Sequence, residues 1–286
     1  MKLSKIFLTL SGIGALGLSV LFLESYRELR RFRVRKVERK LPGVKGRVLF
    51  LTDYHEAVGG KMNPKLLKAA EDACPDLILV GGDFVNGNEE SENYQPALDL
   101  INGLTGIAPV VYAYGNHEKK MIYHSETDGF HWDDYRKGLD PEVTFLVNQW
   151  KDFRLKEGII RVYGLDMEIP YFMKHGETLS TECMERYLGP ADSPYPILLL
   201  AHDPSWGPVY GKWGADLTLS GHYHGGIIRL PLLGGIVSPK FDLFPHFDHG
   251  MYEEGDTRML VSSGLGQHTI PVRFNNLPEM VLIEFV

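Results

Sequence analysis

Five short segments of the sequence place Asp, Asn and His side chains directly after apolar runs. They are Asp53-Tyr54-His55, Gly82-Asp83, Asn116-His117-Glu118, His202-Asp203 and His222-Tyr223-His224. The ends of strands at one edge of a sheet converge, and open α/β sheets bind ligands at the carboxyl ends of their strands. We therefore expect these polar groups to meet at one place.

The spacing inside two of these segments favours shared ions. Asp53 and His55 are two residues apart, as are His222 and His224, so a persisting strand geometry would direct each pair to one side. Taken singly, such residues are more often caps, turn residues or hydrogen-bonded histidines. Together they favour metal ions, because buried carboxylates without compensation are costly. The mixed oxygen and nitrogen donors suit Mn²⁺, Fe or Zn²⁺.

Alternating apolar runs and amphipathic segments predict an α/β fold that could position these residues. The two cysteines lack CxxC spacing, so the sequence does not suggest a thiolate zinc site. Most of the runs lack a polar face and are typical of central strands. We expect strands at residues 46–52, 76–82, 109–115, 159–165, 196–202, 215–221, 258–264 and 279–285, and helices at 63–73, 91–104 and 178–188.

The N-terminal part differs in composition from the rest of the chain. Residues 6–23 contain no charged residue. The length of this segment is about the minimum for a membrane-spanning helix. Residues 1–40 carry ten Lys and Arg against three Glu, a net charge of +7; since the whole chain carries −7, residues 41–286 carry −14. This acidic remainder argues against a nucleic-acid partner.

We accordingly divide the chain into an N-terminal membrane anchor at residues 1–23, a basic juxtamembrane linker at 24–44 and one domain at 45–286. The alternatives are a cleavable signal for the apolar run and a solvated linker for the basic one. The excess of Lys and Arg after the apolar run predicts a single-pass protein of the cell membrane. It favours a cytoplasmic rather than an extracellular domain, with the basic run against the lipid bilayer.

In chain order, the segments DYH, GGDFVNG, YGNHE, LLLAHDP and LSGHYHGG resemble the five motifs of the calcineurin-like metallophosphoesterases. The resemblance extends over about residues 46–286. The C-terminal tail and the N-terminal apolar run are similar to the membrane-anchored bacterial branch, which includes a UDP-diacylglucosamine pyrophosphatase. The resemblance implies a four-layer sandwich of two mixed β-sheets flanked by helices, behind an N-terminal transmembrane helix.

The resemblance also implies a site with two divalent ions, Mn, Fe or Zn. Its ligands would be Asp53, His55 and His224 for one ion, Asn116, His202 and His222 for the other, and Asp83 as the bridge. A bridging hydroxide would attack phosphorus. The catalytic residues would be Asn116, which stabilises the charge, and His117, which protonates or hydrogen-bonds the departing oxygen.

One position departs from the family pattern, because Asn86 stands where the motif usually ends in Asp. Since that position is not usually a ligand, we expect altered metal affinity rather than lost activity.

The reaction implied is hydrolysis of a phosphodiester or pyrophosphate bond in a phosphoester substrate that is lipid-linked or nucleotide-linked. The alternative is a catalytically inactive metal-binding module tethered to the membrane. A module of that kind should have lost some ligands, whereas here every ligand position is filled, which favours the enzyme.

Overall fold

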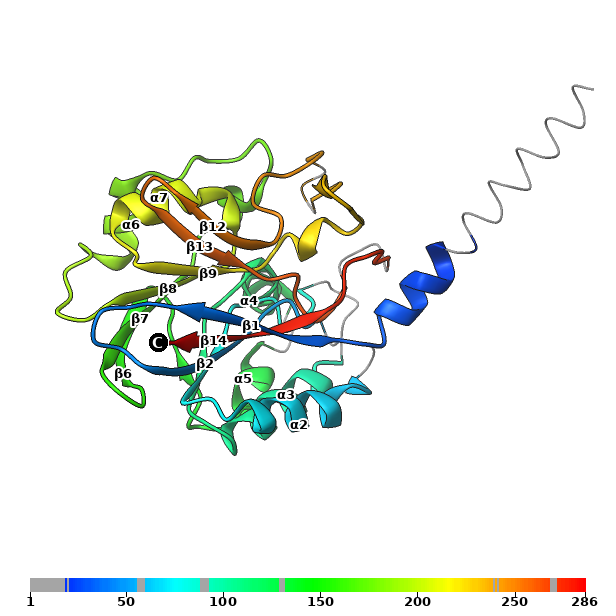
Figure 1. Cartoon of the computed structure of the whole chain (residues 1–286), viewed down its shortest axis with the longest axis horizontal. Coiled ribbons are helices and arrows are strands. Elements are labelled where there is room, and N and C mark those ends of the chain that lie inside the picture. Colours follow the sequence, from blue (N-terminus) through cyan, green and yellow to red (C-terminus); the bar gives the residue numbers. More distant parts are fainter. Residues whose placement is uncertain are drawn as a thin grey trace, which may run out of the picture.

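Two β-sheets lie face to face at the centre of the protein (Figure 1). The computed structural model describes residues 19, 21–55, 60–87, 93–128, 132–238, 240, 242–267 and 272–286. The strands of the first sheet are, in spatial order, β1 (Arg33–Arg39), β14 (Glu279–Phe285), β2 (Gly46–Leu51), β3 (Leu77–Val80), β4 (Val110–Tyr112) and β5 (Thr144–Phe145). Because β14 runs antiparallel to β2 while β2 to β5 are parallel, this sheet is mixed.

The second sheet has the order β12 (Gly250–Glu254), β13 (Thr257–Val261), β9 (Leu217–Ser220), β8 (Ile197–Ala201), β7 (Ile159–Leu165) and β6 (Gln149–Arg154). Its inner strands are parallel, and β12 and β6 are antiparallel edges. A small hairpin of β10 (Arg229–Leu230) and β11 (Gly234–Gly235) follows β9. Both sheets are therefore mixed, as expected.

Helices cover the outer faces of the two sheets. The helices are α2 (Asn63–Ala73), α3 (Gln95–Thr105), α4 (Asn116–Asp128), α5 (Trp132–Gly138), α6 (Thr181–Leu188) and α7 (Gly207–Trp213), with short 3-10 turns η2 (Ile169–Phe172), η3 (Pro204–Trp206) and η4 (His224–Gly226). Leu66 of α2 and Ile101 of α3 pack on the first sheet, whereas Met184 of α6 and Trp213 pack on the second. The result is the predicted four-layer α/β arrangement.

The apolar strands are buried on both faces, and β2 shows why. Its successive side chains point to opposite sides. Leu49 and Leu51 enter the cluster beneath the helices, while Val48 and Phe50 enter the cluster between the sheets. All eight predicted strands are present; β7 and β14 have the predicted limits, and the other six are one to four residues shorter than predicted. The edge strands β1, β6 and β12 were not predicted, because their sequences are mostly polar.

Helix α2 has the predicted limits, and its first residue, Asn63, does not cap it. Its N-cap residue is Met62, without a side-chain hydrogen bond. Asn63 instead accepts a hydrogen bond from the Tyr54 hydroxyl at 2.6 Å and donates to the Pro96 carbonyl at 2.8 Å. Its side chain ties the segment after β2 to the start of α3, rather than capping the helix.

The basic segment that we expected to be a linker is partly a strand. Residues 33–39 form β1, which pairs in parallel with β14. Arg33 and Arg35 form ion pairs at 2.8 and 3.0 Å with Glu279, whose side chain is fully buried. Residues 24–44 are therefore not simply a juxtamembrane linker, because part of this segment completes the first sheet and its cations neutralise a buried carboxylate.

The expectation of a single-pass membrane protein with a cytoplasmic domain requires correction. Within the described part of the chain, every helix is too short or too polar to cross a bilayer. Apart from residue 19 and residues 21–23, the predicted anchor lies outside the described residues. Residues 21–28 are helical and rest on the domain, since Ser25 accepts a hydrogen bond from Arg273 N–H at 3.0 Å and Glu28 accepts one from Asn276 N–H at 2.9 Å.

Candidate metal centre

The seven predicted ligand residues lie together at the carboxyl ends of strands from both sheets. The first sheet contributes those that follow β2, β3 and β4, and the second sheet contributes those that follow β8 and β9. Each of the seven is at most 5% exposed. The residues are Asp53, His55, Asp83, Asn116, His202, His222 and His224. The structure therefore brings the side chains of these segments to one place.

Three overlapping groups of possible ligands share this centre, and one of them joins His117 to His55 and Asp83. Donor atoms of Asp53, His55 and His224 lie within 4.8 Å of one another, and those of Asp83, His202 and His222 do the same. Asp83 lies between the groups: its Oδ2 is 2.9 Å from His202 Nε2 and 3.8 Å from His55 Nε2. This arrangement matches two ions with Asp83 as the bridge.

Buried polar atoms test whether these residues fit metal ions. Among the residues that the structure describes, nothing forms a hydrogen bond with Asn116 Oδ1 or His222 Nε2, although both atoms are buried. Leaving a buried polar atom without a partner costs about 1–3 kcal/mol. Divalent ions would satisfy both atoms and neutralise the two carboxylates, so the donor set fits a dinuclear centre.

In two histidines, Nδ1 donates a hydrogen bond, which leaves Nε2 of the same ring as the possible metal ligand. His202 Nδ1 lies 2.8 Å from the Gly81 carbonyl, which can only accept, so Nδ1 carries the proton. His55 Nδ1 lies 3.0 Å from Asn86 Oδ1 and donates to it in the same way. With a metal ion bound, each ring would be neutral and would present an unprotonated Nε2 on the side of Asp83, as metal-binding histidines do.

His117 has the opposite tautomer. The backbone N–H of Gly87 donates to His117 Nδ1 at 3.0 Å, so the neutral ring carries its proton on Nε2. The backbone N–H of His117 donates to Asp83 Oδ1 at 2.8 Å, which fixes the residue beside the ligands. His117 is therefore arranged to donate a proton or hydrogen bond rather than to coordinate. Gly87 has to be glycine, because a Cβ there would overlap the His117 carbonyl.

The backbone at the ligands departs from strand geometry. Asp53, His55, Asp83, His222 and His224 have φ values of 51°, 43°, 53°, 64° and 47°. Such conformations are uncommon for residues other than glycine and concentrate at functional sites. The strand alternation from which we expected each pair to point to one side therefore does not persist. Asp53 and His55 enter the same ligand group by turning, whereas His222 and His224 enter different groups. His222 is held in place because its N–H donates to Asp53 Oδ1 at 3.0 Å.

Comparison with known proteins decides the family. The family model described as calcineurin-like phosphoesterase matches residues 46–226, which is more than half of the chain. The chain is a calcineurin-like phosphoesterase. It is 28% identical to the uncharacterized metallophosphoesterase YkuE of Bacillus subtilis (strain 168) over 213 residues, or 73% of this chain and 67% of YkuE. It is 27% identical to phosphodiesterase YaeI of Escherichia coli (strain K12) over 242 residues, or 84% and 82%. This phosphoesterase is a metal-dependent phosphoric ester hydrolase.

The protein groups of the phosphoesterase centre strongly shift one another's pKa values. Burial raises the pKa of Asp53 to about 7, against the opposing influence of His202. Burial would also raise the pKa of Asp83, but His202 and His117 hold it well below its usual range. Burial would lower the pKa of His202, yet Asp83 and Asp53 raise it to about 10, whereas burial lowers that of His222 to about 3. Such shifts are typical of metal and catalytic sites.

Glu118 supports the centre in a role that the sequence did not reveal. Its buried carboxylate accepts hydrogen bonds from the N–H groups of Asp83, Phe84 and Gly115 at 2.7–2.8 Å. It thereby joins the turn after β3 to the start of α4. The position of Glu118 in the GNHE segment was the available sign of this role. Its contacts with the backbone after β3, however, cannot be read from the spacing of residues in the sequence.

Two residues of the C-terminal tail also support the phosphoesterase centre. The Asn276 amide donates to the His224 carbonyl at 2.6 Å. The fully buried guanidinium of Arg273 donates to the Gly266 carbonyl at 3.1 Å, and the Gly266 N–H donates to the Asp53 carbonyl at 2.6 Å. No spacing in the sequence indicated either role.

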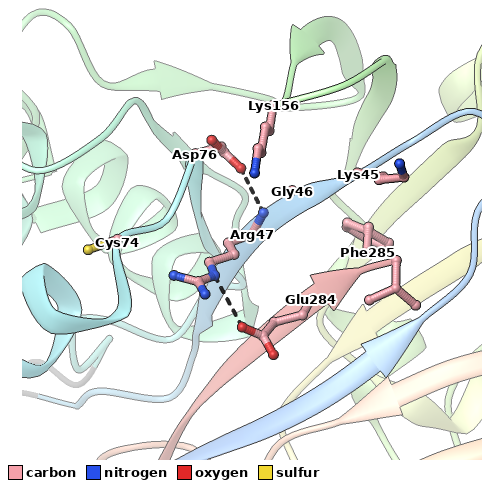
Figure 2. A pocket seen from close by; sticks show the side chains of 9 residues that line it. Lys45, Gly46, Arg47, Cys74, Asp76, Lys156, Glu284 and Phe285 are labelled. Atoms are coloured by element: carbon pink, nitrogen blue, oxygen red, sulfur yellow. Dashed lines mark hydrogen bonds and ion pairs between the residues drawn. The ribbon is translucent and has the colours of Figure 1, made fainter.

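A separate cavity of about 590 Å³ lies at the amino end of β2 and is not part of this centre (Figure 2). Figure 2 shows two contacts among its polar groups: Asp76 accepts from the Arg47 N–H at 2.7 Å, and Arg47 pairs with Glu284 at 3.1 Å. Lys45 pairs with Glu157 at 3.1 Å. The cavity contains none of the predicted ligands.

Proposed function

We propose that this phosphoesterase is a phosphodiesterase or pyrophosphatase with two divalent ions at the candidate metal centre. The observation that carries the proposal is the convergence of the seven ligand residues around Asp83, with His117 beside them. We assign Asp53, His55 and His224 to one ion, Asn116, His202 and His222 to the other, and Asp83 to both. The relative in E. coli that is named a phosphodiesterase supports this reaction class.

The protein residues have separate roles in this proposal. Bound divalent ions would supply Lewis-acid stabilisation of the phosphoryl oxygens and activate water for attack. His117 donates from Nε2 to the departing oxygen, because its Nδ1 is occupied by the Gly87 N–H. The Asn116 amide group can donate to a phosphoryl oxygen while its Oδ1 faces the ion. Burial of the centre strengthens each of these interactions.

For the substrate, we propose a phosphodiester or pyrophosphate that is nucleotide-linked or lipid-linked. The sequence resemblance to a family branch that includes a nucleotide-sugar pyrophosphatase supports this class. Fold alone does not determine the leaving group.

The test is metal-dependent turnover by the full chain. The protein is stripped with a chelator and titrated with Mn²⁺, and hydrolysis of bis-p-nitrophenyl phosphate is compared with that of p-nitrophenyl phosphate. We expect turnover that requires metal and favours the diester. Preference for the monoester would contradict the phosphodiesterase assignment, and absence of turnover with two ions bound would contradict the reaction.

Two variants locate that activity. Asp83→Asn removes the proposed bridging charge and should lower turnover by roughly 100-fold or more. Asp76→Asn makes the same chemical change at the separate cavity of Figure 2 and should leave turnover unchanged. Equal turnover in the two variants would show that the activity arises elsewhere.

A further inference from the structure

A cavity of about 330 Å³ opens directly from the proposed second ion site. Two of its lining residues, Asn116 and His222, are proposed ligands of that ion. Whatever fills this cavity therefore lies next to a phosphoryl group held at the centre.

One wall of the cavity is apolar. The Phe172 ring packs against the rings of His222 and His202, with centroids 5.6 and 6.3 Å away. Met173, the next residue, lines the same cavity and is 60% exposed. These side chains limit the access of water on that side, which strengthens electrostatic attraction inside the cavity.

Three lysines line the remaining wall, and they differ in how their charges are neutralised. Lys240 Nζ lies 2.6 Å from the fully buried carboxylate of Asp203. Lys174 Nζ lies 2.7 Å from Asp242. Lys120, by contrast, has neither an ion-pair nor a hydrogen-bond partner in the part of the chain that the structure describes. Its positive charge is available to a ligand.

The position of Lys120 is fixed relative to the centre. It lies four residues after Asn116 on α4, so the two side chains share one face of that helix. Its Cβ also lies close to Gly87, whose N–H donates to His117. The lysine is thus set on the same rigid element as a proposed ligand and next to the proposed proton donor.

We propose that this cavity binds a second anionic group of the substrate, a phosphate or carboxylate beyond the phosphoryl group under attack, and that Lys120 recognises it. The inference rests on the proposed function, because it takes the first phosphoryl group to lie at the metal centre. If the cavity binds such a group, the substrate is a phosphate ester that carries a second anionic group, rather than any phosphodiester. A second cavity, of about 290 Å³, shares Met173, Lys174 and Lys240 with the first and leaves room for the remainder of such a molecule.

Binding of small phosphonates to the Mn²⁺-loaded full chain tests this inference without relying on turnover. Methylphosphonate has one anionic group; methylene-, ethylene- and propylenediphosphonate have two, at increasing separation. By calorimetry we expect at least one diphosphonate to bind about tenfold more tightly than methylphosphonate. Lys120→Ala should abolish this gain, and Lys120→Arg, which keeps the charge, should retain most of it.

Lys65→Ala is the matched control, because it removes a lysine from the exposed face of α2 and should preserve the gain. The inference is overturned if no diphosphonate binds more tightly than methylphosphonate, or if the gain survives Lys120→Ala. Turnover of bis-p-nitrophenyl phosphate by the same wild-type preparation separates the two proposals. No turnover with a Lys120-dependent gain would contradict the proposed function alone, and turnover without the gain would contradict this inference alone.

Discussion

At the scale of single residues, hydrogen bonds divide the buried histidines of the centre into two kinds. His55 and His202 donate from Nδ1 and present Nε2 as a ligand, whereas His117 accepts at Nδ1 and presents an Nε2–H. The same side chain thus serves as a ligand or as a proton donor according to one neighbouring group. That difference leads to separate predictions for the two kinds.

Substituting His117 by Ala should lower the rate of phosphodiester hydrolysis and leave metal content unchanged. We expect a loss of roughly 100-fold or more for a diester with an alkyl leaving group, because such an alkoxide needs a proton. The loss with p-nitrophenolate, which departs without help, should be much smaller. Equal losses for the two leaving groups in steady-state kinetics would contradict the role of His117 as a donor.

We expect substitutions of Asn86 to change the affinity for metal ions, because Asn86 Oδ1 accepts a hydrogen bond from the His55 ring at 3.0 Å. Asn86→Ala should weaken Mn²⁺ binding by about 10- to 100-fold, because His55 loses the group that orients it. Asn86→Asp should strengthen binding, because a carboxylate makes the ring more basic. Titration with Mn²⁺ measures both, and unchanged affinity in Asn86→Ala would exclude this role.

At the scale of elements, the N-terminal strand is the main difference between sequence and structure. β1 reads as a basic linker because Arg and Lys dominate it, yet two of its cations, Arg33 and Arg35, contact the carboxylate of Glu279 on β14. Burial would raise the pKa of Glu279, but His249, Arg35 and Arg33 overcome this and lower it to about 2. The pairing of β1 with β14 therefore depends on a charged contact.

Glu279 makes the stability of this sheet dependent on pH. Because its folded pKa lies below the ordinary value of 4.5, its contribution is complete above pH 4.5 and is lost as the pH falls toward 2. Glu279→Gln should lower the free energy of unfolding at pH 7 by about 3 kcal/mol. The difference from the wild type should shrink at pH 3.

Urea unfolding at the two pH values measures this effect. Glu284→Gln on the same strand removes only an ion pair with Arg47 at the surface, so it should cost below about 1 kcal/mol. A Glu279→Gln difference that is as large at pH 3 as at pH 7 would contradict the assignment.

The strands that were predicted best from the sequence are those buried on both faces, because such burial requires apolar residues. β8 is apolar throughout, and β2 is apolar from Val48 to Leu51, because both faces of these segments are covered; the two strands were predicted within a residue or two. The edge strands β6 and β12 carry polar side chains on an exposed face, so their pattern does not differ from that of a loop. Strands at the centre of the sheets can therefore be predicted from the sequence, whereas strands at the edges cannot.

At the scale of the whole molecule, the metal centre is complete only when the two sheets are packed together. Asp53 follows a strand of the first sheet and accepts from the N–H of His222, which follows a strand of the second. The seven proposed ligands could be assigned from the sequence because five short motifs resemble those of a known family. The support from Glu118, Arg273 and Asn276 could not, because it consists of contacts with backbone atoms of distant segments.

The central claim is that these seven side chains hold two divalent ions on either side of Asp83. The most direct measurement is anomalous diffraction from crystals of the Mn²⁺-loaded protein. We predict two Mn²⁺ peaks, one contacting Asp53, His55 and His224, the other contacting Asn116, His202 and His222, with Asp83 touching both. A single peak, or peaks at other residues, would contradict the claim.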